Sequence, residues 1–407
     1  MMKMSNHLKK QWIKLGLFLM ACALGIAGIF FNRIELALIA SLAMGFSFWN
    51  LKKKHSEEED ETIISDKDET GSGRLILTIA LFIFAVLFGI GAVYFSKSPE
   101  SGSLSLILWL TSIALIISAG IVFDRVDSFA WLKRIKQMSS EARRYLFIEI
   151  ALVSVITEIA LMLRATSLDH FPAGMHGDEG EIGMEALRVL GIGNPITPFG
   201  TGWASLPALF FYLPAGFISI FGRNEIGVRM VSALFGTLCI PLTYLIGRKF
   251  WGKLAGFTGA WLISVSHFNI HYSRLGVNCI EAVFFMLLFI LLVLAPHSHN
   301  LSDQDRERNK SAYSIFPKDK FNITPYIAAG VTCGLAQYIG IYSRLIPLVA
   351  LPLCIVLFIQ KRINIIQIVI LGLTAILVFA PWECITFNAQ LILPAEWRLS
   401  PFLILSI

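Results

Sequence analysis

The sequence predicts an all-helical protein that crosses a membrane many times. Of the 407 residues, 56% are hydrophobic and only 15% are charged, and the mean hydropathy is +0.69. This is more apolar material than the core of a water-soluble domain holds. The apolar residues also fall in long runs, and a helix needs about 20 of them to cross the hydrocarbon layer. About eleven runs approach that length, at residues 13–31, 34–49, 75–95, 104–123, 145–163, 227–246, 254–268, 279–294, 325–338, 345–359 and 365–381.

The Lys and Arg residues predict the orientation, because cytoplasmic loops of membrane proteins are enriched in them. A further apolar run at residues 205–222 would break this pattern if it crossed the membrane. We therefore predict an interfacial or re-entrant helix there, broken at Pro214. The expected topology is that of a plasma-membrane protein with a cytoplasmic N-terminus and a first extracytoplasmic loop at residues 164–226. The basic segments that then share the cytoplasmic side are residues 8–14, 51–74, 124–144, 247–253, 296–320 and 360–362.

Two regions follow from this layout. Residues 1–140 hold four predicted spans and, at about 52–74, an acidic cytoplasmic linker whose charged sequence predicts disorder. Residues 141–407 hold every polar motif discussed below and are predicted to be the functional membrane domain. A last apolar run begins at residue 401 and stops at 407, so we expect a C-terminal truncation. The net charge of +6 belongs to the short loops between spans, which argues against a nucleic-acid partner.

Two adjacent carboxylates, Asp178 and Glu179, stand between glycines in the predicted outer loop. Ionisable groups at a bilayer boundary are costly and usually line a site, so we predict a catalytic centre here. A structural interpretation stays open, in which Asp178 is the N-cap of a short helix and Glu181 completes a capping box. The two interpretations are compatible, because a helix start that faces a cavity also favours a phosphate.

Arg274 and Arg344 are candidate phosphate ligands. Each ends a Tyr-Ser-Arg triplet at a predicted outer helix end, together with Tyr272 and Tyr342. The forked guanidinium suits a phosphate, whereas the alternative is a side chain that anchors a span at the interface. Arg164, at the end of another run, is expected to be structural, through Glu158 or the carboxylate loop, or to contact the substrate.

Other side chains offer weaker signals. Trp203 and Pro207 would form an apolar, stacking wall for a substrate, or would simply pack. His267 and His271 are four residues apart, and His176 precedes Asp178 by two; that spacing permits a metal site. Isolated interface histidines are commoner, so we expect no metal and no other cofactor.

The order of these motifs resembles a known family. It consists of a span ending in Arg164, a loop with Asp178-Glu179-Gly180, and the segments 223–252, 271–278, 337–348 and 379–398. The pattern is similar to lipid-carrier-dependent glycosyltransferases of the membrane type C (GT-C) fold, in the protein O-mannosyltransferase and aminoarabinose-transferase-like group. The similarity covers residues 145–398, so the first four spans lie outside it.

The resemblance implies an enzyme that moves a hexosyl or pentosyl group from a polyprenyl phosphate to a protein, lipid or glycan acceptor. Asp178 would be the general base and Glu179 would orient the acceptor or donor. Arg274 and Arg344 would hold the carrier phosphate. The rival function is a transporter or flippase of a lipid-linked or anionic substrate, which would place charges near the midplane in broken helices. A scaffold or sensor that uses the acidic linker is a third alternative. The charges at the outer edge favour the enzyme.

Overall fold

The computed structural model describes residues 69–96, 98–126, 130–296 and 322–392. The chain divides into two compact units, residues 1–76 and 77–407, and apart from residues 69–76 the elements discussed below belong to the second. Within the described ranges every regular element is a helix, and a single isolated bridge joins Thr201 and Pro207. The all-helical fold class is therefore confirmed. The runs expected at residues 13–31 and 34–49, and the acidic linker, lie outside the described residues.

Six helices of the described chain are long and apolar enough to cross a membrane, or seven if a bent pair counts as one span. The bent pair is α11 (His267–Arg274) and α12 (Cys279–Leu294), which meet at 118°. The six are α3 (Glu69–Phe95), α4 (Gly102–Asp124), α6 (Ser140–Ala165), α9 (Glu225–Trp251), α15 (Leu345–Ile359), extended at its start by η4 (Ile341–Arg344), and α16 (Ile365–Ile392).

Two of the expected spans are shorter than predicted. The runs at 254–268 and 325–338 form α10 (Lys253–Val265) and α14 (Thr324–Ala336), each of 13 residues. At 1.5 Å per residue such a helix is about 20 Å long, less than the hydrocarbon layer of about 30 Å. The described residues thus support a multi-pass membrane protein but not the full count of eleven spans.

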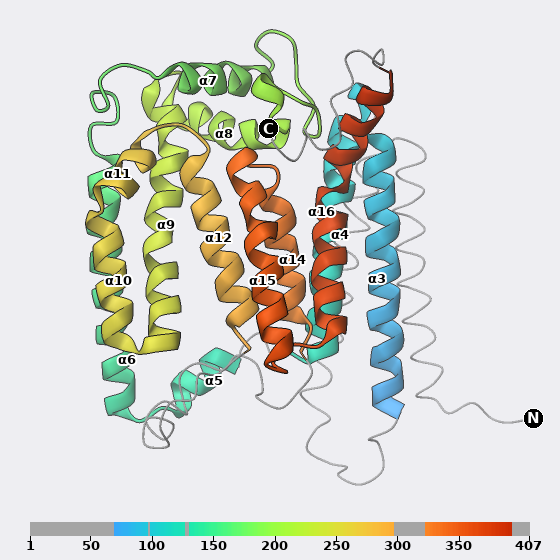
Figure 1. The fold of residues 1–407 in the computed structure, drawn as a ribbon, viewed down its shortest axis with the longest axis vertical. Helices are drawn as coiled ribbons and strands as arrows, with labels where there is room; N and C mark the ends of the chain where they lie inside the picture. The colour runs from blue at the N-terminus through green and yellow to red at the C-terminus, as the bar shows by residue number, and fades with distance from the viewer. Residues whose placement is uncertain (1–68, 97, 127–129, 297–321, 393–407) are drawn as a thin grey trace, which may run out of the picture. The chain divides into compact units, whose positions relative to one another are not determined.

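The helices pack in two connected groups (Figure 1). In one, α9 contacts α6, α10 and α12; in the other, α14 contacts α16, α12 and α4. Glycines permit the closest approaches, since a Cβ on Gly247 would lie 2.9 Å from the Cα of Gly256, and one on Gly334 would lie 2.7 Å from a carbonyl oxygen of α16. Small residues at such crossings are typical of helices packed inside a membrane.

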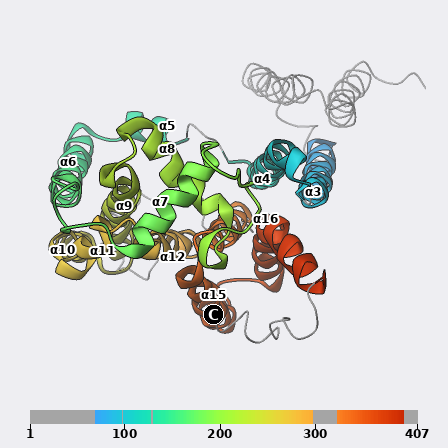
Figure 2. The same ribbon diagram turned by 90° about the horizontal axis from the view of Figure 1, so that it is seen from above.

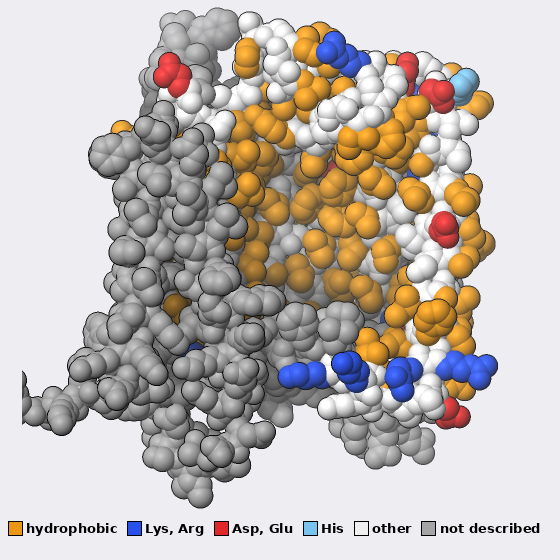
Figure 3. Space-filling model, turned by 180° about the vertical axis from the view of Figure 1, so that it is seen from behind, with side chains coloured by type: hydrophobic (Ala, Val, Ile, Leu, Met, Phe, Trp, Pro, Cys, Tyr) orange, Lys and Arg blue, Asp and Glu red, His pale blue; other side chains and the backbone are white. Residues whose placement is uncertain are grey.

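The two ends of the helix bundle differ in charge. Figure 3 shows a row of Lys and Arg at one end, below a broad hydrophobic belt. α9 has Arg248 and Lys249 in its last turn, and Lys361 follows α15; both helices end at the same end of the bundle in Figure 1. At the other end, α7 (Gly177–Val189) and α8 (Tyr212–Phe221) lie across the tops of the long helices (Figures 1 and 2). The described basic segments at residues 247–253 and 360–362 thus share one end, as predicted, whereas the predicted segments 8–14, most of 51–74 and 297–320 lie outside the described residues.

The predicted interfacial helix is present, although its break is elsewhere. Residues 208–221 form η3 (Ala208–Phe211) and α8, which run across the end of the bundle rather than through it (Figure 1). The helix type changes between Phe211 and Tyr212. Pro214 lies in the first turn of α8, where a proline removes no helical hydrogen bond, so the prediction of a break at Pro214 is wrong. The remaining elements are η1 (Pro99–Ser101), α5 (Ala130–Gln137) and η2 (Trp203–Ser205).

Candidate active site

Asp178 and Glu179, predicted to lie in a loop, are in the first turn of α7. The N-cap of this helix differs from the one expected. His176, rather than Asp178, is the N-cap: its Nδ1 accepts from the backbone N–H of Asp178 at 3.2 Å. Glu179 completes the capping box, because its Oε2 accepts from the backbone N–H of His176 at 2.8 Å. Glu181 is therefore not part of the cap. The carboxylate of Asp178 accepts none of these capping bonds. It is 52% exposed, and its Oδ2 lies 3.9 Å from Nδ1 of His176.

Glu179 forms a fully buried ion pair with Arg229 of α9. The Nε of Arg229 donates to Oε1 at 2.8 Å, and one terminal nitrogen donates to Oε2 at 3.0 Å; both side chains are 0% exposed. The remaining N–H groups of Arg229 bind backbone carbonyls of the preceding loop, at Leu168, Pro172 and Gly174. All five donors of this guanidinium are thus satisfied.

Glu179 also reaches the break between α11 and α12. The backbone N–H of Gly276 donates to its Oε1 at 2.6 Å. Burial opposes ionisation of this carboxyl, but the hydrogen bonds from Arg229, Gly276 and His176 outweigh burial and lower its pKa. The carboxylate is out of reach of a substrate in this arrangement. The expected role of Glu179 in orienting acceptor or donor is therefore replaced by a structural one, the fixing of three chain segments around Asp178.

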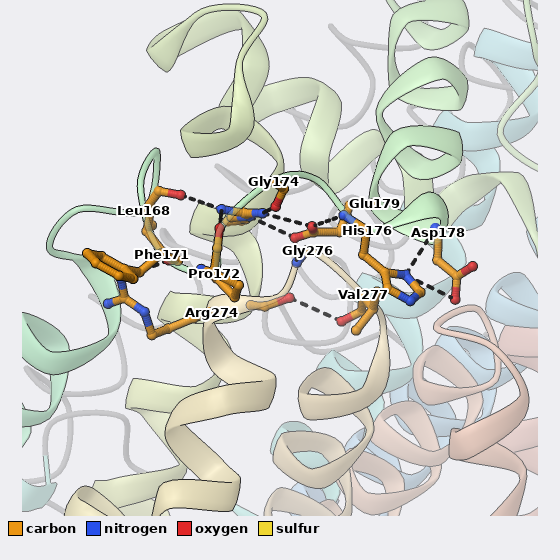
Figure 4. A network of polar contacts seen from close by, with 12 residues as sticks. Leu168, Phe171, Pro172, Gly174, His176, Asp178, Glu179, Arg274, Gly276 and Val277 are labelled. Carbon is orange, nitrogen blue, oxygen red and sulfur yellow. Dashed lines mark hydrogen bonds and ion pairs between the residues drawn. The ribbon is translucent and has the colours of Figure 1, made fainter.

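Arg274 is committed to backbone carbonyls in the same way. Its terminal nitrogens donate to Leu163 and Thr166 at 2.9 and 2.8 Å, at the end of α6, and to Phe171 at 2.9 Å in the loop. Figure 4 shows this guanidinium at the opposite end of the polar network from Asp178. The predicted phosphate contact is not supported by this geometry.

Arg164 is also structural. Its side chain is completely buried and donates to the carbonyls of Ser264 and Ile263, both at 3.1 Å, and to the amide oxygen of Asn269 at 2.6 Å. These groups lie at the end of α10 and in α11. The expected partners, Glu158 and the carboxylate loop, are therefore not the ones it binds, and a substrate contact is not supported.

A second set of side chains does gather near Asp178. Tyr342, in η4, interacts with Cys279 at the start of α12 and electrostatically with Tyr272 and Asp178. Tyr342 is 49% exposed, and Tyr272 is half-buried. Arg344 follows in the same short helix, is half-buried, and interacts with Glu383, in the second half of α16. The two Tyr-Ser-Arg triplets thus contribute their tyrosines to one place but direct Arg274 elsewhere.

Trp203 lies in the loop between α7 and α8, and this loop is hydrogen-bonded to α7. Its backbone N–H donates to Oε1 of Glu185 at 3.1 Å, and its side chain is half-buried. Pro207, four residues on, is buried and packs as part of the loop, in agreement with the packing alternative. The stacking role of Trp203 stays a prediction.

The histidines do not assemble into a metal centre. The rings of His267 and His271 lie 6.2 Å apart on α11, whereas His176 uses Nδ1 to cap α7. Across the described part of the chain, no three His, Cys, Asp or Glu side chains gather in a way that could hold a metal ion. The absence of a cofactor stays a prediction.

Sequence reasoning missed Arg229, Gly276 and Glu185. A usable signal existed for Arg229, which is a cation near the outer start of an apolar run and demands a partner when buried. Gly276 has no local signal, because it acts through its backbone. Glu185 precedes Arg188 by three residues, a spacing typical of ion pairs on one helix, but its bond to the backbone of the distant Trp203 loop has no signal in the sequence.

Comparison with known proteins supports the expected class. A model of the dolichyl-phosphate-mannose-protein mannosyltransferase family matches residues 205–303, which include α9 with Arg229 but not Asp178. An undecaprenyl phosphate-alpha-4-amino-4-deoxy-L-arabinose arabinosyl transferase of Pseudomonas savastanoi pv. phaseolicola is 25% identical over 253 residues, covering 59% of this chain and 43% of the relative. A Pseudomonas fluorescens enzyme with the same name and the suffix 1 is 26% identical over 253 residues, covering 59% and 42%.

These matches support a GT-C glycosyltransferase of the aminoarabinose-transferase-like group, and the predicted resemblance is confirmed at that level. The chain spans less than half the length of the curated relatives it matches. No solved structure matches it significantly.

Proposed function

We propose that this chain carries the catalytic membrane part of an enzyme that moves a hexosyl or pentosyl group from a polyprenyl phosphate to an acceptor hydroxyl. The names of the relatives support the donor class, because each is a transferase named for an undecaprenyl phosphate-linked sugar. The acceptor is a protein, lipid or glycan. A membrane-embedded donor also accounts for a site placed at the ends of apolar helices.

The observation that carries the proposal is the contrast between the two adjacent carboxylates. Glu179 is 0% exposed and fixed by Arg229, whereas the side chain of Asp178 is 52% exposed at the same helix start. An exposed carboxylate held by a rigid backbone suits a general base, which contributes typically about 10²–10⁴-fold to a reaction. Asp178 takes the proton of the acceptor hydroxyl as the hydroxyl oxygen attacks the sugar C1 and the lipid phosphate leaves.

A cation must meet the charge that develops on the leaving phosphate. We assign this role to Arg344, which follows Tyr342 by two residues in η4 and interacts with the carboxyl group of Glu383. Tyr342 interacts electrostatically with Asp178 and with Tyr272, and both tyrosines offer hydroxyl groups to the sugar. We place the site on the extracytoplasmic side because α7 lies at the end of the bundle opposite the basic row (Figures 1 and 3).

The proposal is tested with purified protein in proteoliposomes that contain a radiolabelled polyprenyl-phosphate sugar pool, with a radiolabelled nucleotide sugar as the comparison. We expect release or transfer of label from the lipid pool only, with membrane extract as the acceptor source. Transfer from the nucleotide sugar would contradict the donor class. Movement of the labelled lipid to the other leaflet, without release, would identify the rival function, a flippase.

A further inference from the structure

The loop between α7 and α8 contains a strained turn at Trp203–Ser205. Ala204 and Ser205 both have positive φ, at 53° and 58°, a region that residues with a Cβ rarely adopt. Two consecutive residues of this kind persist only where the surroundings impose the conformation, and such strain is typical of functional sites. Backbone bonds close the turn, from Gly202 N–H to Leu206 O at 2.9 Å and from Leu206 N–H to Trp203 O at 3.0 Å.

Glu185 of α7 holds this turn in place. It is 8% exposed, and its Oε1 accepts from the N–H of Trp203 at 3.1 Å. Both of its oxygens also accept from Arg188 at 2.8 Å, and Arg188 in turn donates to the carbonyl of Asn194 at 2.9 Å. Gly202 lies so close that a Cβ there would be 3.1 Å from the other carboxylate oxygen. Glu185 and Arg188 together therefore bind the loop to α7 at two points, Trp203 and Asn194.

The turn packs against the part of the chain that carries Tyr342. A Cβ on Gly340 would lie 2.9 Å from a methyl carbon of Leu206, and Gly340 directly precedes η4. Asn278, at the start of α12, donates to the carbonyl of Ile339 at 2.5 Å. The turn, η4 and the start of α12 thus form one packed assembly next to the residues around Asp178, and the tip of the turn at Ala204 and Ser205 is exposed.

We propose that Glu185 is a positioning residue that holds the strained Trp203–Ser205 turn so that Trp203 stacks on the sugar of the lipid-linked donor. This inference rests on the proposed function and assigns a sugar contact within the same site. An indole ring offers an apolar face and one N–H donor, which together suit the face and hydroxyl groups of a sugar. A turn fixed in advance avoids the cost of ordering the loop when the donor binds.

Removing the strain from the turn distinguishes a turn that positions Trp203 for the donor from a turn that only connects two helices. Ala204→Gly permits the same φ without strain and frees the backbone. The matched control is Lys361→Gly, which makes the same change at a residue with φ of 55°, in the turn after α15. Thermal unfolding in detergent is measured for both variants, to establish that each is folded.

The decisive measurement is retention of a radiolabelled polyprenyl-phosphate sugar pool by the purified protein, without acceptor. We expect Ala204→Gly and Glu185→Ala to weaken retention by about three- to tenfold, and Lys361→Gly to match the unmodified protein. Glu185→Gln keeps one oxygen for the Trp203 N–H, so its donor retention should lie between that of Glu185→Ala and that of the unmodified protein. Retention by Ala204→Gly and Glu185→Ala equal to that of Lys361→Gly would overturn the inference.

Transfer kinetics separate this inference from the proposed function. For the variants of the turn we expect a raised KM for the donor and an unchanged kcat, because the general base is untouched. A lowered kcat with normal donor retention would contradict the positioning role. Loss of transfer in Asp178 variants is a separate result, which tests the base and not the turn.

Discussion

The guanidinium of Arg229 and the carboxylate of Glu179 form a completely buried pair, 2.8 Å apart at their closest atoms. The pair joins α7 to α9 across 50 positions of sequence, and through Gly276 it also reaches the bend before α12. An ion pair in such surroundings survives only when every donor and acceptor is used. Because the pair fixes the first turn of α7, it also fixes the neighbouring Asp178.

The first prediction concerns the stability that this pair provides. Arg229→Met and Glu179→Leu each leave one buried charge without its partner, so each should lower the free energy of unfolding by about 3–5 kcal/mol. The double variant should lose less than the sum of the two. Thermal unfolding in detergent measures the effect, with Glu181→Gln, an exposed change on the same helix, as the control. Single variants as stable as this control would contradict the account.

The second prediction concerns acid. The folded state lowers the pKa of Glu179 below its ordinary value, so its ionised form stabilises the fold above that ordinary value. This stability is lost as the pH falls through the folded pKa. The difference in melting temperature between the unmodified protein and Glu179→Gln should therefore be largest near neutral pH and shrink in acid. A difference that stays constant down to about pH 3 would show that the carboxylate is not held ionised.

The third prediction concerns the cap of α7. His176 accepts from the N–H of Asp178 through Nδ1, which places the proton of the neutral ring on Nε2. Asparagine is an equally good N-cap, whereas alanine costs about 1 kcal/mol. We expect His176→Asn to retain transfer and stability, and His176→Ala to lose both in part. Equal transfer by the two variants would show that the cap does not position Asp178.

The fourth prediction separates the two roles considered for Arg274. Its guanidinium donates to carbonyls of α6 and the following loop, and a lysine cannot spread its charge over these groups. Both Arg274→Lys and Arg274→Ala should therefore lower the melting temperature, with the KM for the donor unchanged in the fraction that stays folded. A normal melting temperature with a raised KM would restore the phosphate role.

The fold was predictable where the physics is local. Apolar runs and basic loops were enough to predict the helices, the separation of charge between the two ends, and the crosswise helix at residues 208–221. The lengths of α10 and α14 were not predictable to the same degree, because helix ends depend on the neighbours that satisfy their last carbonyls.

The different positions of Asp178 and Glu179 follow from the helical period of α7, a signal that is present in the sequence. Glu179 precedes Ile182 by three residues and Ala186 by seven, and all three are buried on one face of α7. The helical period therefore places Glu179 inside and Asp178 outside. Using that period would have separated the base candidate from the structural residue.

The binding partners of Arg229 and Arg274 could not be predicted from the helical period. The loop at residues 166–176 has no regular structure, so its carbonyls need donors from elsewhere. Arg229 and Arg274 supply them, but the pairing of a loop with a distant side chain leaves no trace in spacing. A Tyr-Ser-Arg triplet at a helix end is equally compatible with a phosphate and with a carbonyl.

The most direct test of the account is the transfer rate of Asp178→Asn with a radiolabelled polyprenyl-phosphate sugar pool, measured beside Glu181→Gln at equal protein level. Because asparagine keeps the shape of the side chain but cannot accept the acceptor proton, we predict a loss of about 100-fold or more in transfer. Donor retention and melting temperature should equal those of Glu181→Gln. Transfer by Asp178→Asn at the rate of Glu181→Gln would contradict the assignment of Asp178 as the general base.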